Sequence, residues 1–192
     1  DRFINNNFWI ELMNDLISII ILAVVQGVTE WFPVSSSSHL IIISKFLGFN
    51  NNLLFDVSLH FGTLMAVFVY FGKDIIEIVR DLLSFNFKSE NGKMGLMLIV
   101  ASIPAAIFGF FMREIMKESV NSISLIPLGL GITGIILLIG SLDYKNKNKG
   151  ILSYKNIIII GIAQAFSIFR GISRTGSTVS TRQSVQESLP QP

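Results

Sequence analysis

A polar interruption between two apolar runs constrains this chain more than any other feature. Residues 26–39 read QGVTEWFPVSSSSH, after the apolar run Leu16 to Val25 and before a second run that begins at Leu40. The interruption carries a carboxylate (Glu30), four consecutive serines and an imidazole (His39). Ionisable groups are expensive inside a bilayer, so such a cluster between membrane segments predicts a functional site.

The composition favours a membrane protein over a soluble domain. Hydrophobic residues make up 51% of the 192 residues and charged residues only 15%, whereas soluble domains carry about 25% charged residues. The net charge of +2 is too small to suggest a nucleic-acid partner, and the absence of cysteine excludes disulfides and thiolate metal sites. Because apolar runs recur along the whole chain, we expect an all-α polytopic membrane protein with a single membrane domain over residues 1–192.

The lengths of the apolar runs predict which of them cross the bilayer. Three runs are long enough for full spans: Val57–Gly72, Met94–Met112 and Leu125–Leu142. In contrast, Leu16–Val25 has only ten residues, about 15 Å as a helix and half of a bilayer core, and the run after the interruption is also short. We therefore expect residues 16–47 to form a re-entrant helical hairpin, in which irregular backbone is tolerated only against protein or water.

Positive charge in the connecting segments predicts the orientation. Lysine and arginine concentrate in residues 73–93 and 143–155. The positive-inside rule places both segments on the cytoplasmic side. The first hairpin would then enter the membrane from outside, and residues 157–178 would enter it from inside.

Residues 157–178 resemble the first hairpin. Shifted by 138 residues, IIILAVVQGVTEWFPVSSSS aligns with IIIIGIAQAFSIFRGISRTG, so that Gln26 falls on Gln164 and Ser35 on Ser173. An odd number of full spans separates the two copies, so the second copy would be inverted. We expect residues 1–142 to form a first repeat, residues 157–180 the start of an inverted second repeat, and residues 181–192 an atypical tail. The alternative is a chance likeness between two isoleucine-rich runs.

In inverted-repeat membrane proteins the broken helices meet at the site, which here would bring Glu30, Ser36 and His39 against Arg174. An arginine beside hydroxyls and glycine amides suits a tetrahedral oxyanion, because the guanidinium offers a planar fork of donors. Ser36 or His39 is a candidate nucleophile or proton donor, and Glu30 is a candidate cation ligand. The candidate substrate-binding residues are Ser35, Ser37, Ser173, Thr175 and Gly176. Together these residues predict phosphoryl-group hydrolysis within a membrane.

Each candidate also has a structural interpretation. Serines often bond the backbone at membrane breaks, Glu30 could pair with Arg174 without chemistry, and His39 alone would more often be a satisfied core histidine. His60 and Thr63 lie three residues apart and could border the pocket, but His60 could equally bond a neighbouring helix. The combination of groups in two breaks favours the functional interpretation.

Both breaks resemble signatures of one family. QGVTEWFPVSSSSHL is similar to (E/Q)GxTE(F/W)xPxSSxxHL, the first signature of the undecaprenyl-diphosphate phosphatase family of bacitracin-resistance type. FRGISRTGST resembles the second signature, PGxSRSGxT, and FDVSLHFGTLMAVFVYF looks like the family segment between them. The resemblance runs from about residue 16 to residue 180.

The resemblance implies a multi-pass plasma-membrane enzyme that hydrolyses undecaprenyl diphosphate to the monophosphate lipid carrier of envelope glycan synthesis. It also implies bacitracin resistance, interdigitated inverted repeats with two re-entrant hairpins, and dependence on Mg²⁺ or Ca²⁺. Its signatures assign catalytic roles to Glu30, Ser36, His39 and Arg174, and metal binding to Glu30 and Gln26. The expected partners are the polyprenyl diphosphate lipid and the bilayer, with a homodimer left open and no nucleic acid.

Three departures from the signatures keep alternatives open. Gln26 leaves one carboxylate fewer for a cation, and Arg170 replaces the proline of the second signature. Family members continue for several helices after that signature, whereas TRQSVQESLPQP ends this chain, so we expect a C-terminal truncation. Besides the phosphatase, the sequence leaves open a polyprenyl-phosphate flippase or transporter, which can share the repeat architecture, and an inactive truncated remnant.

Overall fold

The computed structural model describes residues 6–119, 125–143, 154–169 and 171–187. Within these ranges the chain forms helices without strands: α1 (Asn6–Thr29), α2 (Ser36–Phe46), α3 (Leu53–Leu83), α4 (Glu90–Ser119), α5 (Leu125–Asp143), α6 (Tyr154–Phe166) and α7 (Arg174–Glu187). Three segments are long and apolar enough to cross a membrane: Trp9–Thr29, Leu53–Leu83 and Glu90–Met112. The predicted class, an all-α polytopic membrane protein, is confirmed.

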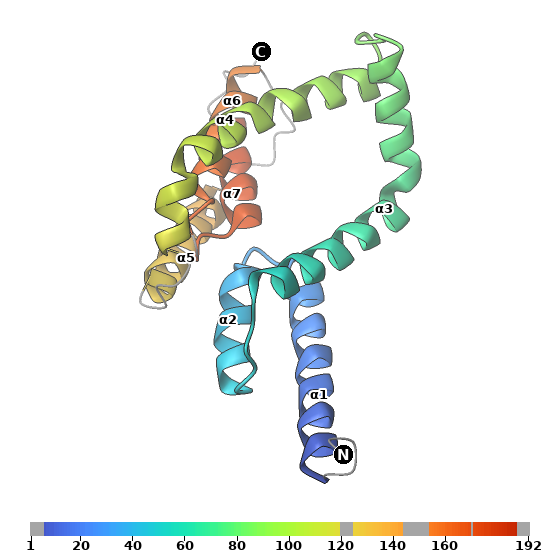
Figure 1. Ribbon diagram of the computed structural model, residues 1–192. Helices are drawn as coiled ribbons and strands as arrows, with labels where there is room; N and C mark the ends of the chain where they lie inside the picture. Colours follow the sequence, from blue (N-terminus) through green and yellow to red (C-terminus); the bar gives the residue numbers. More distant parts are fainter. Residues whose placement is uncertain (1–5, 120–124, 144–153, 170, 188–192) are drawn as a thin grey trace.

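The helices form two groups joined by an arch (Figure 1). The chain runs up α1, reverses at the first break and descends α2, and then α3 leads away to the far side of the molecule. α4 returns from there and packs against α6, while α7 packs against both α5 and α6. The start of α3 also contacts α1. The two breaks, α1–α2 and α6–α7, thereby come to lie where the two groups approach each other.

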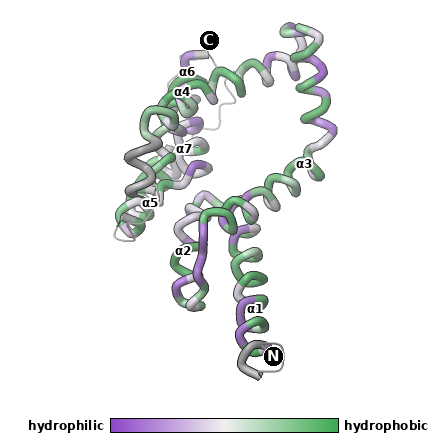
Figure 2. The backbone as a smooth tube through the Cα atoms, viewed as in Figure 1, coloured by the Kyte–Doolittle hydropathy of each residue, from purple (hydrophilic) through white to green (hydrophobic). Residues whose placement is uncertain are grey.

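Apolar side chains of the long helices point outward. None of the residues of α3 is buried, and apolar residues cover most of α1, α3 and α4 (Figure 2). The small buried apolar core of the described ranges consists of Leu22, Leu40, Ile126, Ile157, Ile160 and Ala165. A soluble protein seldom exposes apolar surface on this scale, whereas lipid solvates it.

The helix before the first break is longer than expected. α1 begins at Asn6, and its apolar part, Trp9–Thr29, has 21 residues. The expectation that this helix is only about half as long as a bilayer core is thick is therefore wrong. Glu11 and Asp15 lower the hydropathy of the sequence but leave the backbone hydrogen bonds of a helix intact, and the first proline comes at Pro33. α2, with 11 residues, is short as expected. The re-entrant path of residues 16–47 stays a prediction.

The next two helices also extend past their apolar runs. α3 continues through Lys73 to Leu83, so only residues 84–89 connect it to α4. The expected end of the run at Gly72 is marked instead by a kink, since the preceding Phe71 has non-helical dihedral angles (φ −101°, ψ 16°). Charged side chains such as Lys73 end the apolar run of the sequence, but they do not end the helix.

The second break repeats the order of the first: helix α6, a turn, then helix α7. α7 continues through the start of the expected tail to Glu187, so residues 181–187 are helical, while residues 188–192 lie outside the described ranges. The two-repeat division and the inversion of the second copy stay predictions.

The packing of α4 on α6 depends on the missing side chain of Gly161. A Cβ atom at this position would lie 2.5 Å from the carbonyl oxygen of Ala101 and 3.1 Å from Cγ of Pro104. Because the backbone of α4 cannot yield as a flexible side chain does, Gly161→Ala should lower the stability by about 1–3 kcal/mol. Thermal unfolding of the detergent-purified protein measures the loss.

Gly134→Ala is the matched control, since a Cβ atom at Gly134 in α5 would meet nothing within 4 Å. It should leave the melting temperature unchanged or raise it slightly. Equal melting temperatures for the two variants would show that the close α4–α6 approach is not required.

Candidate functional site

A cavity of about 870 Å³ lies between the two breaks and α3. The first break contributes Thr29, Glu30, Trp31, Phe32, Ser35, Ser36 and Ser37; α3 contributes Leu53, His60, Thr63, Leu64 and Val67; the second break contributes Ser167, Ile168, Phe169, Ile172, Ser173, Arg174 and Thr175. The backbones of the two breaks approach closely, because a Cβ atom on Gly176 would lie 3.3 Å from the carbonyl oxygen of Pro33. The two segments that the sequence paired are therefore neighbours in space.

The first break turns through a left-handed residue. Ser35 has φ 63° and ψ 85°, a conformation that costs about 1–3 kcal/mol for a residue other than glycine and concentrates at functional sites. Its buried hydroxyl lies 3.0 Å from the hydroxyl of Ser38, which holds the turn. α2 starts at the next residue, and this places Ser36 and Ser37 on the cavity wall.

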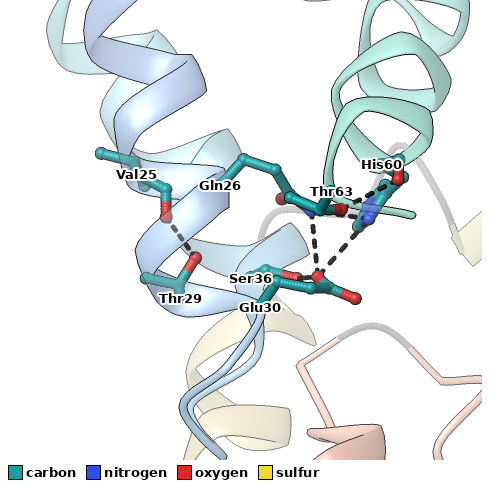
Figure 3. Close-up of polar contacts among 7 residues, drawn as sticks. All are labelled: Val25, Gln26, Thr29, Glu30, Ser36, His60 and Thr63. Carbon is teal, nitrogen blue, oxygen red and sulfur yellow. Dashed lines mark hydrogen bonds and ion pairs between the residues drawn. The ribbon is translucent and has the colours of Figure 1, made fainter. Parts of the chain in front are cut away.

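The Glu30 carboxylate is held by one of its two oxygens. Oε2 accepts hydrogen bonds from Ser36 Oγ at 2.6 Å and from Gln26 Nε2 at 3.0 Å, and it lies 3.5 Å from His60 Nδ1. Figure 3 shows these contacts meeting at one oxygen. Within the part of the chain that the structure describes, no hydrogen bond engages the other oxygen, Oε1. Donors from α1 and α2 thus fix a half-exposed carboxylate at the cavity wall.

His60 reaches this cluster from α3. Gln26 Nε2 lies 2.7 Å from His60 Nδ1, and an amide nitrogen can only donate, so Nδ1 accepts. The sequence left two interpretations of His60 open, a border of the pocket and a bond to a neighbouring helix. Both are true, since His60 lines the cavity and bonds a residue of α1.

His39 lies behind the cavity wall. Its Nδ1 is 2.9 Å from the carbonyl oxygen of Ser35. A carbonyl oxygen only accepts, so Nδ1 carries the proton and a neutral His39 keeps its lone pair on Nε2. His39 is not among the residues that line the cavity. The structure therefore does not bring it to the cavity wall with Glu30 and Arg174, and its catalytic role stays a prediction.

The second break is anchored by Thr133 in the middle of α5. The hydroxyl of Thr133 shares its one proton between the carbonyl oxygens of Gly171 at 2.9 Å and of Gly129 at 3.0 Å, and it accepts from the backbone nitrogen of Ser173 at 2.9 Å. Gly171 has φ +95°, and a Cβ atom there would lie 2.6 Å from Cα of Gly129. Sequence reasoning missed Thr133; its only signal was a hydroxyl in the middle of an apolar, glycine-rich run.

Arg174 opens α7 at the cavity. Ser173 caps this helix, because its hydroxyl accepts from the backbone nitrogen of Gly176 at 3.1 Å. Arg174 is exposed and lines the cavity together with Thr175. An anion there would meet a guanidinium and the positive end of the α7 dipole. Across the described ranges no ion pair joins Arg174 to Glu30, so the alternative of a structural pair is not what the structure shows.

Two oxygens suit the expected divalent cation. Gln26 is 1% exposed, and its Oε1 is buried without a hydrogen-bond partner among the described residues, where Glu30 Oε1 also has none. Mg²⁺ and Ca²⁺ prefer oxygen ligands, and Mg²⁺ is commonly held by one or two protein groups together with phosphate oxygens. Among the described residues no cluster of three or more His, Asp or Glu offers a complete cage. Glu30 lines the cavity and fits a cation shared with a phosphate substrate, whereas the buried Gln26 does not line it. Metal binding by both residues stays a prediction.

These features define a class: a helical membrane protein in which two polar helix breaks and a long apolar helix line a cavity that carries a carboxylate on one side and an arginine at a helix N-terminus on the other. The family model of the bacitracin resistance protein BacA matches residues 19–186, and the chain belongs to this family.

Curated relatives agree with this assignment. The undecaprenyl-diphosphatase of Caldicellulosiruptor bescii is 44% identical over 167 residues, which cover 84% of this chain and 62% of the relative. Those of Thermosipho melanesiensis and Teredinibacter turnerae are 39% and 38% identical, over 83% and 86% of this chain and 63% and 64% of the relatives. The chain therefore spans less than two thirds of the length of these relatives.

Thr133→Val should loosen the second break. The valine keeps the shape but leaves the Gly171 carbonyl and the Ser173 amide buried without a partner, at a cost of about 1–3 kcal/mol per group. We expect a lower melting temperature. Ser141→Ala is the control on the same helix, because the exposed Ser141 hydroxyl bonds only the Leu138 carbonyl. Equal effects of both variants would contradict the anchoring role of Thr133.

Proposed function

We propose that this chain forms the site-bearing part of a plasma-membrane phosphatase that converts undecaprenyl diphosphate to undecaprenyl phosphate and inorganic phosphate. One observation carries the proposal: a single cavity presents Arg174 and the α7 N-terminus from one break, and Glu30 with Ser36 from the other. The names of the curated relatives support the choice of substrate. Release of the monophosphate would recycle the lipid carrier and support bacitracin resistance.

The cavity suits both ends of this substrate. Arg174 and the first amides of α7 would bind the terminal phosphate, because they place positive charge where the negative charge develops. The apolar part of the lining would receive the first units of the prenyl tail; it comprises Leu53, Leu64, Val67, Ile168, Phe169 and Ile172. A head group at the breaks and a tail between α3 and the second break is the arrangement that a membrane lipid requires.

Ser36 is the nucleophile that the geometry favours. Its hydroxyl already donates to Glu30 Oε2 at 2.6 Å, so Glu30 can take the proton as Ser36 Oγ bonds the terminal phosphorus. The bond from that phosphorus to the bridging oxygen then breaks, and undecaprenyl phosphate leaves. Water next attacks the phosphoserine, the proton returns to Ser36 Oγ, and inorganic phosphate departs. With Glu30 as its ligand at the cavity wall, Mg²⁺ or Ca²⁺ would neutralise charge on the phosphate oxygens.

Arg174→Ala should abolish phosphate release. Without the guanidinium, the negative charge that develops on the phosphate oxygens loses its main hydrogen-bond donor. We expect kcat to fall by at least about 100-fold. Arg174→Lys should be intermediate, since lysine keeps the charge but loses the fork. Phosphate release from undecaprenyl diphosphate by the purified protein measures the effect.

Arg182→Ala is the matched control, because Arg182 is an exposed arginine two turns further along α7 and outside the cavity lining. Near-normal turnover by Arg174→Ala would refute the role of Arg174. Movement of labelled polyprenyl phosphate across vesicles without any phosphate release would favour a flippase instead.

Removal of divalent cations should also stop the reaction. We expect chelation with EDTA to lower phosphate release by the wild type, and added Mg²⁺ or Ca²⁺ to restore it. Glu30→Gln should remain inactive at any cation concentration, because it removes both the ligand charge and the proton acceptor. Full activity in EDTA would contradict the cation requirement, and an active Glu30→Gln variant would contradict the role of Glu30.

A further inference from the structure

The imidazole of His60 is the one polar group that α3 adds to the Glu30 cluster. α3 has no buried residue, yet His60 comes within 2.7 Å of Gln26 Nε2 and 3.5 Å of Glu30 Oε2. We infer that His60 is a positioning residue, which fixes the Gln26 amide and through it the Glu30 carboxylate. The inference rests on the proposed phosphatase function and adds a residue to it.

The orientation of the Gln26 amide follows from its neighbours. One N–H group donates to Glu30 Oε2 at 3.0 Å and the other to His60 Nδ1 at 2.7 Å. If the amide turned over, its oxygen would face an anionic oxygen on one side and the imidazole lone pair on the other. The contact with Glu30 would then join two acceptors, whereas the imidazole can donate or accept according to its tautomer. The carboxylate therefore sets the orientation of the amide, and His60 Nδ1 accepts its second N–H group.

This orientation leaves the amide oxygen without a partner. Gln26 Oε1 is buried and accepts no hydrogen bond from the part of the chain that the structure describes, which normally costs about 1–3 kcal/mol. Without His60, the Gln26 amide would keep only its hydrogen bond to Glu30, and it could rotate so that Oε1 reaches a donor. The hydrogen bond to the imidazole therefore holds Gln26 Nε2 against Glu30. The Glu30 carboxylate then stays in one position, where it accepts the hydrogen bond from Ser36.

The role also explains why the contact comes from α3. Gln26 and Glu30 follow each other by one turn at the end of α1, and Ser36 opens α2. His60 belongs to a third element, α3, and adds a second acceptor to the Gln26 amide beside Glu30 Oε2. Figure 3 shows His60 reaching across from α3 to the cluster formed by the other two elements.

The kinetic test compares two substitutions of His60 in the full chain. His60→Leu removes the acceptor, and we expect kcat for undecaprenyl diphosphate to fall about 10–100-fold, as supporting residues of catalytic groups typically do. KM should stay within about threefold of the wild type, because the Arg174 side of the cavity is untouched. His60→Asn keeps an acceptor near the position of Nδ1 and should recover kcat to within about fivefold of the wild type.

Ser58→Ala is the matched control on α3. Its exposed hydroxyl bonds only the Leu54 carbonyl of the same helix, so the substitution should leave kcat and KM unchanged. His60→Phe accompanies the leucine variant as a second apolar replacement, with thermal unfolding as the measure of folding. Failure of both apolar variants to fold would overturn the positioning role, since His60 would then belong to the fold.

A spectroscopic readout tests the contact independently of activity. The chain contains only two histidines, so the side-chain nitrogen signals of ¹⁵N-histidine-labelled protein come from His39 and His60 alone, and His39→Asn identifies them. The Nδ1 signal of His60 should shift in Gln26→Leu, while the His39 signals stay in place. An unchanged His60 signal would overturn the inferred contact.

The outcomes separate this inference from the proposed function. A wild-type protein that releases no phosphate overturns the proposed function and the role of His60 together. Wild-type phosphate release with normal kcat in His60→Leu overturns the positioning role alone. Equal impairment of His60→Asn and His60→Leu also overturns it, because the acceptor would then not matter.

Discussion

The site depends on one constraint: the polar groups at two breaks between apolar helices must find their partners within the protein. Thr133 satisfies the second break by bonding the Gly171 carbonyl and the Ser173 amide. At the first break, Ser36 and Gln26 satisfy one oxygen of Glu30. Unsatisfied polar groups are costly where water is scarce, so these bonds hold both breaks in one arrangement, and the cavity follows from that arrangement.

The cavity joins elements with different tasks. The second break contributes positive charge through Arg174 and the start of α7, and the first break contributes the carboxylate and the serine hydroxyls. α3 contributes His60 along with apolar lining, although none of its residues is buried. The proposed phosphate recognition, proton transfer and contact with a prenyl tail would thus fall to separate elements, so that no single segment of the chain would contain a complete site.

Much of the site could be predicted because ionisable residues are rare in apolar sequence. Glu30 and Arg174 stand out in their breaks, and the internal likeness of the two segments indicated that they would meet. Helix ends were predicted less well. Hydropathy alone suggested that the helix before the first break starts near Leu16, whereas α1 begins at Asn6, since a charged side chain changes the solvent preference of a helix and not its hydrogen bonding.

The sequence by itself determined the membrane class, the positions of the two breaks and the family, because apolar length, proline and glycine placement and long signatures are local properties. Only the tertiary structure decided which polar groups touch. It placed His60 on Gln26 and Thr133 on the second break, and it set His39 behind the cavity wall. The contacts of His60 and Thr133 join residues 34 to 40 positions apart, and their geometry depends on how helices pack, which no local pattern records.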